Sequence, residues 1–213
     1  HPQQHFGRWA TVGVVLLLIS HVGYGYWRAG QLSDERPEQL AVALIQGNFE
    51  QSQKWDPALQ QETIARYLSL SEQALLEHPD LLIWPEAATP FYLQDPSPLA
   101  AQVHHLPKRS GVPLLVGSPA YQSAPNGDYQ YLNSAFLIGR DGQRQARSDK
   151  VHLVPFGEYV PLGPLLSFID KLVVGVGDFT PGTIVPLPLG EHHLGVLVCY
   201  EVIFPYLARQ HVQ

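Results

Sequence analysis

A run of residues without formal charge, from Trp9 to Trp27, is the strongest constraint that this sequence places on its fold. Its 19 residues would extend roughly 28 Å as a helix, close to the thickness of a bilayer's hydrocarbon core. Aromatic residues stand at both ends, as in interfacial belts, and Arg8 and Arg28 close the segment. We therefore expect a membrane-spanning helix at about residues 9–27. A signal peptide and a buried core helix are the alternative interpretations of this pattern.

The composition indicates a folded chain and excludes several classes of protein. The 213 residues are 45% hydrophobic and 15% charged, which is too apolar for a disordered chain. One Cys allows neither an internal disulfide framework nor a Cys-based zinc finger. Because 13 Lys and Arg stand against 19 Asp and Glu, for a net charge of −6, we expect no nucleic-acid partner. The chain has no Met and begins with His1, so we expect it to be a piece of a longer protein.

We expect the chain to have three parts: residues 1–30 end a membrane domain, residues 31–40 form a polar linker, and residues 41–213 form a globular domain. Short apolar runs predict strands at 41–46, 81–84, 113–116 and 194–198. Helices are predicted at 56–77, opening with Asp56-Pro57, at 99–109, and from Glu201 onward. Turn signals at 126–127 and 139–142 flank an alternating strand at 129–138. This order predicts an α/β fold with a mixed sheet.

Three residues with useful chemistry follow predicted strands. Cys199 comes directly after the strand at 194–198, Glu86 follows the strand at 81–84, and Lys150 follows the predicted hairpin. Ligands of α/β folds bind at such strand ends. A carboxylate can take a thiol proton and a lysine can stabilise an oxyanion, so the set suits acyl transfer through a thioester. The alternatives are a structural Cys, a capping Glu and a solvated Lys.

Other motifs in the chain are incomplete. GSP at 117–119 lacks the second Gly of a serine-hydrolase elbow, and GVG at 175–177 lacks the later Gly of a dinucleotide loop. The adjacent histidines at 104–105 and 192–193 would point to opposite faces of a strand. We therefore expect neither a metal site nor a cofactor.

The order Glu86, Lys150, Cys199, each at a strand end, resembles the nitrilase superfamily of Glu-Lys-Cys hydrolases and acyltransferases. Within that superfamily, several sequence blocks resemble the apolipoprotein N-acyltransferases. They are QGN at 46–48, KW at 54–55, WPEA at 84–87, KVHLVPFGEYVP at 150–161 and CYE at 199–201. An apolar span directly before the catalytic domain also suits this family and not the soluble amidases.

The resemblance implies a nitrilase-like α-β-β-α sandwich preceded by one transmembrane helix. It implies an enzyme of the bacterial inner membrane whose catalytic domain lies on the periplasmic side. Its acyl donor would be a phospholipid, and its acceptor the N-terminal diacylglyceryl-Cys of an apolipoprotein.

The resemblance also implies roles for individual residues. Cys199 matches the nucleophile, Glu86 the general base and Lys150 the cation that stabilises the oxyanion. Glu158 matches a second acid that supports the site, and Tyr200 and Glu201 match supporting positions near the pocket. Trp55 matches a substrate-binding residue.

The chain departs from the family pattern at both ends. Such enzymes have several spans before the catalytic domain, and the nitrilase fold continues well beyond its Cys, whereas this chain stops at Gln213. We therefore expect an incomplete catalytic domain. Two other functions stay open: an amidase that hydrolyses small amides with the same three residues, and a membrane-anchored binding module with a structural Cys.

Overall fold

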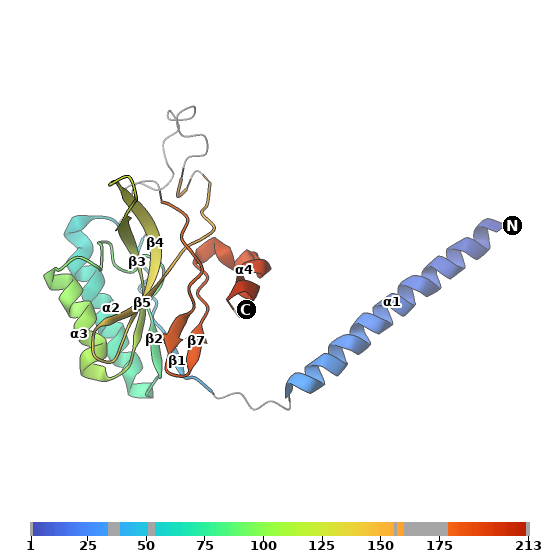
Figure 1. Cartoon of the computed structure of the whole chain (residues 1–213). Helices are drawn as coiled ribbons and strands as arrows, with labels where there is room; N and C mark the ends of the chain where they lie inside the picture. Colours follow the sequence, from blue (N-terminus) through green and yellow to red (C-terminus); the bar gives the residue numbers. More distant parts are fainter. Residues whose placement is uncertain (1, 34–38, 51–53, 156, 160–178, 212–213) are drawn as a thin grey trace. The chain divides into compact units, whose positions relative to one another are not determined.

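The computed structural model describes residues 2–33, 39–50, 54–155, 157–159 and 179–211 (Figure 1). The chain divides into two units, His1–Gln39 and Leu40–Gln213. Several sequence features lie outside the described residues. They are 34–38 of the predicted linker, Phe156 and 160–161 of the longest sequence block, and the GVG at 175–177.

The first unit contains a single long helix, α1 (Pro2–Ser33). Within it, Arg8–Gln31 has a mean hydropathy of 1.4 and is long and apolar enough to cross a membrane. Apolar side chains lie on every side, since the consecutive residues Leu16 to Ile19 are each 60–62% exposed. A helix that is apolar all round has no polar face to turn to water. The apolar helix predicted at 9–27 is confirmed, and the polar residues at each end continue it.

The second unit is built on a mixed five-stranded sheet in the order β1-β2-β3-β4-β5. Its strands are β1 (Val42–Leu44), β2 (Leu81–Ile83), β3 (Leu114–Ser123), β4 (Tyr129–Ile138) and β5 (Arg144–Asp149). The β1–β2 and β2–β3 pairs are parallel, and the β3–β4 and β4–β5 pairs are antiparallel. The parallel pairs are joined by helical crossovers and the antiparallel pairs by hairpins, as their geometry requires. The predicted mixed α/β sheet is confirmed.

The β3–β4 hairpin is longer than the sequence predicts. The strand predicted at 113–116 continues to Ser123, because β3 pairs with β4 without a break from Leu114↔Ile138 to Ser123↔Tyr129. At the hairpin turn, Gly127 has a φ of 88°, in the left-handed region that Gly adopts without strain. Both strands of this hairpin are therefore ten residues long.

Helices α2 (Gln60–Ala74) and α3 (Pro98–Ser110) cover one face of this sheet (Figure 1). The helix predicted at 56–77 is divided, because the short 3-10 segments η1 (Pro57–Leu59) and η2 (Leu75–Glu77) flank α2. Asp56 caps η1 by accepting a hydrogen bond from the Ala58 N–H at 2.9 Å. This confirms the helix start predicted from Asp56-Pro57.

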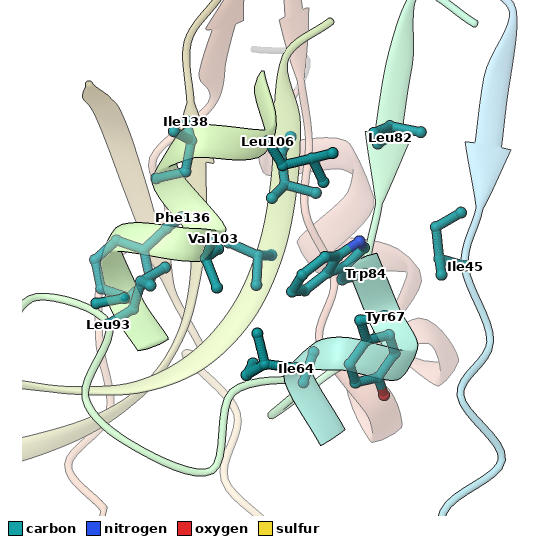
Figure 2. Close-up of a cluster of buried hydrophobic side chains, with 14 of the residues drawn as sticks. Ile45, Ile64, Tyr67, Leu82, Trp84, Leu93, Val103, Leu106, Phe136 and Ile138 are labelled. Atoms are coloured by element: carbon teal, nitrogen blue, oxygen red, sulfur yellow. The ribbon is translucent and has the colours of Figure 1, made fainter. Parts of the chain in front are cut away.

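The main core lies between these helices and the sheet (Figure 2). In Figure 2, Trp84 lies among Tyr67 of α2 and Val103 and Leu106 of α3. The Trp84 ring stacks on Tyr67 with ring centroids 5.0 Å apart, and Trp84 Nε1 donates to Ser71 Oγ at 2.8 Å. The Ser71 hydroxyl in turn donates to the Tyr67 carbonyl at 2.8 Å. This satisfied polar chain fixes the residue two positions before Glu86.

The opposite face of the sheet packs on a second, two-stranded sheet of β6 (Leu187–Leu189) and β7 (His192–Leu194). Beyond it lie η3 (Cys199–Ile203) and α4 (Pro205–Gln210), with Leu207 buried (Figure 1). The layers of this unit are therefore helix, sheet, sheet and helix, which confirms the predicted α-β-β-α sandwich.

The strand predicted at 194–198 is wrong for most of its length. The structure has a strand at His192–Leu194, and residues 195–198 follow it in irregular conformation with Val198 alone buried. Within the described ranges these residues have no strand partner, and an apolar run without a partner for its N–H and C=O groups does not form a strand. The histidines at 104–105 also lie in α3 and not in a strand.

Candidate active site

Glu86, Lys150 and Cys199 line one pocket of about 320 Å³. Glu86 lies in the turn after β2, Lys150 directly follows β5, and Cys199 opens η3. Trp55 and Glu158 line the same pocket, whereas Tyr200 and Glu201 do not. The other described lining residues are Lys54, Ala87, Pro119, Asn133, Val154, Gly157 and Phe179.

Lys150 is a buried cation held between two carboxylates. Its side chain is 1% exposed, and its Nζ lies 2.9 Å from Glu158 Oε1 and 3.6 Å from Glu86 Oε1. Its backbone is fixed as well, since its N–H donates to the Asn133 carbonyl and its carbonyl accepts from the Gly182 N–H, both at 2.8 Å. Because leaving this arrangement would strand a buried charge, the ammonium stays at the pocket wall.

Asn133 connects the two carboxylates. Its Nδ2 donates to Glu86 Oε1 at 2.7 Å and to Glu158 Oε1 at 2.9 Å, and the residue is buried. A side-chain amide supplies two donors without adding charge, so it holds two like-charged groups near one cation. This residue belongs to none of the sequence motifs described above. The available signal was an Asn inside a predicted strand, where Asn is depleted.

The turn that carries Glu86 has a constrained backbone. Ala87 has a φ of 47°, in the left-handed region that residues with a Cβ seldom adopt. Gly117 of β3 lies so close that a Cβ there would be 2.4 Å from the Pro85 carbonyl oxygen and 2.6 Å from Glu86 Cα. Lys54 Nζ donates to the Glu86 carbonyl at 3.0 Å. These contacts hold the Glu86 carboxylate at the pocket.

Cys199 occupies a strained position at the start of η3. Its φ is 56°, and its side chain is exposed toward solvent. Partial burial of the Cys199 sulfur raises the pKa of its thiol, as do the charge and hydrogen bond of Glu86, whereas the Lys150 ammonium and the Tyr200 N–H lower it. Burial and Glu86 outweigh the two groups that lower this pKa. The thiol is therefore protonated at neutral pH and requires a base before it can attack.

Glu201 is a buried anchor and not a pocket residue, being 2% exposed. Its Oε1 accepts from the N–H groups of Val151 at 2.8 Å and His152 at 2.9 Å, and its Oε2 accepts from the Val198 N–H at 2.8 Å. One carboxylate therefore ties the segment after β5 to the turn that carries Cys199.

Tyr200 and Trp55 are placed differently from each other. Tyr200 is 46% exposed and packs on Phe204, so its N–H and not its ring acts on Cys199.

The Trp55 Nε1 is buried and has no hydrogen-bond partner among the residues that the structure describes. Over the same ranges, no group of three or more His, Cys, Asp and Glu side chains could hold a metal ion.

The pocket residues fall within a stretch, residues 41–213, that matches the sequence profile of the carbon-nitrogen hydrolase family. The chain belongs to this family. The chain is 46% identical over 207 residues to an apolipoprotein N-acyltransferase of Geobacter metallireducens, covering 96% of the chain and 39% of that protein. It is 34% identical over 217 residues to an apolipoprotein N-acyltransferase of Brucella suis, covering 94% and 40%. The chain thus spans 39–40% of the length of these two relatives.

Solved structures share the fold of this chain at low sequence identity. A carbon-nitrogen hydrolase from Helicobacter pylori has a TM-score of 0.55 at 21% identity, covering 80% of this chain and 55% of its own. An amidase from Nesterenkonia sp. has a TM-score of 0.56 at 22% identity, covering 82% and 61%. The structures confirm the nitrilase-like fold, and the curated relatives confirm the resemblance to apolipoprotein N-acyltransferases.

Proposed function

We propose that this protein is an N-acyltransferase that moves an acyl chain from a phospholipid to the N-terminal diacylglyceryl-Cys of an apolipoprotein. The observation that carries the proposal is the convergence of Glu86, Lys150 and Cys199 on one pocket. Similarity to named apolipoprotein N-acyltransferases over nearly the whole chain supports the choice of substrates.

In the first half of the proposed cycle, Cys199 takes the acyl group. Glu86 accepts the thiol proton, and the thiolate attacks the ester carbonyl of the phospholipid. The Lys150 ammonium and the Tyr200 N–H stabilise the oxyanion of the tetrahedral intermediate. The C–O bond of the ester then breaks, and the glycerol oxygen receives the proton from Glu86. Lysophospholipid leaves, and a thioester remains on Cys199.

In the second half, the acceptor resolves the thioester. The α-amine of the diacylglyceryl-Cys attacks the thioester carbonyl, and Glu86 takes a proton from the nitrogen. The C–S bond breaks, an amide is formed, and the Cys199 sulfur recovers the proton from Glu86. We place the reaction at the periplasmic face of the bacterial inner membrane, with α1 as a membrane span, because an enzyme anchored in the membrane meets its lipid substrate without that lipid crossing water.

The direct test is to trap the acyl-enzyme. Full-length protein in detergent micelles is incubated with an acyl-labelled phospholipid, denatured, and treated with hydroxylamine, which cleaves thioesters. We expect hydroxylamine-sensitive label on the wild type and none on Cys199→Ala. Label that persists in Cys199→Ala, or no label on the wild type, contradicts the mechanism.

The same preparation tests the two alternatives. An amidase would hydrolyse small amides in the absence of lipid, so turnover of such amides without acyl transfer to an apolipoprotein peptide would favour it. A binding module with a structural Cys would leave Cys199 unreactive to iodoacetamide and would tolerate Cys199→Ser.

A further inference from the structure

Two cations line the described part of the pocket, Lys54 and Lys150, and they differ in what they contact. Lys150 is sealed from solvent between Glu86 and Glu158. Lys54 is only partly buried, and its Nζ donates to a main-chain oxygen, the Glu86 carbonyl, at 3.0 Å. The two lysines therefore have different capacities for a ligand.

Lys54 keeps donors available to a ligand. Within the ranges that the structure describes, no carboxylate oxygen lies within 4.0 Å of its Nζ, so its charge is not neutralised by an ion pair. An ammonium group has three N–H donors, and the carbonyl of Glu86 uses one of them. Burial lowers the pKa of Lys54, and the nearby negative charge of Glu86 opposes this shift.

The charges of the pocket explain why such a cation is needed. A glycerophospholipid carries a negative phosphodiester, separated from its acyl ester by the short glycerol backbone. Glu86 and Glu158 would repel this group, and Lys150 is already engaged by both of them. Since like charges brought together in a partly buried site are unfavourable, the phosphodiester needs a cation that those carboxylates do not hold.

We propose that the Lys54 ammonium binds the phosphodiester of the phospholipid acyl donor, while its contact with the Glu86 carbonyl keeps it beside the catalytic turn. This rests on the proposed acyltransferase function and adds a subsite to it. Lys54 thereby distinguishes an anionic lipid ester from a neutral ester, because the neutral ester gains nothing from the cation.

The test compares two acyl donors on the same full-length protein. Acylation of Cys199 is measured with acyl-labelled phosphatidylglycerol in micelles and with the neutral ester p-nitrophenyl butyrate. The measured quantity is the ratio of kcat/KM for phosphatidylglycerol to kcat/KM for the ester. Because the ester reports any damage to Glu86 or Cys199, the ratio isolates recognition of the phosphodiester.

We expect Lys54→Met to lower this ratio about tenfold or more, chiefly through the KM for phosphatidylglycerol, because one charge-assisted hydrogen bond is lost. Lys54→Arg, which keeps a charged donor, should restore most of the ratio. Lys108→Met, an exposed lysine on α3, makes the same charge change outside the pocket and should leave the ratio unaltered.

Two outcomes would overturn the Lys54 subsite, and a third would overturn the proposed acyltransferase function. If Lys54→Met slows both donors equally, Lys54 acts on the Cys199–Glu86 pair and the phosphodiester subsite is rejected. If the ratio is unaltered with both rates intact, the subsite is rejected as well. If the wild type is acylated by the ester but never by phosphatidylglycerol, the proposed acyltransferase function fails, whatever Lys54 does.

Discussion

Replacing Glu201 by Gln should destabilise the unit Leu40–Gln213, because the carboxylate holds three backbone N–H groups in a buried place. A hydrogen bond to a charged group contributes about 1.5–3 kcal/mol. The Gln carbonyl can still accept from Val151 and His152, but its NH2 would face the Val198 N–H. The bond to Val198 is then lost, the two remaining bonds lose their charge, and two donors lack acceptors, for a total of about 3–5 kcal/mol. Typical domains have only about 5–15 kcal/mol of stability.

The measurement is urea unfolding of the full-length protein in detergent, followed by tryptophan fluorescence. The matched control is Glu191→Gln, since Glu191 is exposed in the β6–β7 turn and undergoes the same charge change. We expect the control to remain within about 0.5 kcal/mol of the wild type. If the free energy of unfolding of Glu201→Gln equals that of the control, the Glu201 carboxylate does not stabilise the unit, and the prediction is refuted.

Three further predictions concern the pocket. Glu86→Gln removes a negative charge that raises the Cys199 pKa, so alkylation of Cys199 by iodoacetamide should begin at lower pH. Lys150→Met removes a positive charge that lowers this pKa, so alkylation should begin at higher pH. Equal pH profiles in the variants and the wild type would contradict these directions. Asn133→Asp adds a third carboxylate to the cluster and should slow Cys199 acylation about tenfold or more in the labelling assay, an effect that wild-type rates in the variant would disprove. Gly117→Ala puts a Cβ 2.6 Å from Glu86 Cα and should cost about 1–3 kcal/mol in urea unfolding, so an unchanged midpoint would show that the turn can yield.

The sequence predicts the site best where a single local signal decides the structure. Pro85 ends the strand before Glu86, Asn126-Gly127 sets the β3–β4 turn, and Asp56-Pro57 starts the helical segment that includes α2. Each signal acts over a few neighbouring residues, through a fixed φ, a missing N–H or a side chain that caps a backbone group. The order of strands and helices follows from such signals.

The rest depends on partners that lie far away in the chain. Asn133 reaches Glu86 across 47 positions, and Glu201 reaches Val151 across 50, so neither contact leaves a local pattern. The strand expected at 194–198 fails for the same reason, since an apolar run becomes a strand only when a neighbouring strand pairs with it. The Cys199 pKa is raised by burial, which the sequence cannot measure.

The burial of Lys150 makes ionic strength a tool for separating the steps of the proposed cycle. Dissolved ions screen exposed charges strongly and buried ones weakly, and Lys150 is 1% exposed between its two carboxylates. Passing a proton from Cys199 to Glu86 moves one negative charge within this cluster and leaves its total unchanged. The chemical steps should therefore proceed at nearly the same rate as salt is added. Capture of the lipid by the less buried Lys54 should weaken, so salt distinguishes binding from chemistry without any substitution.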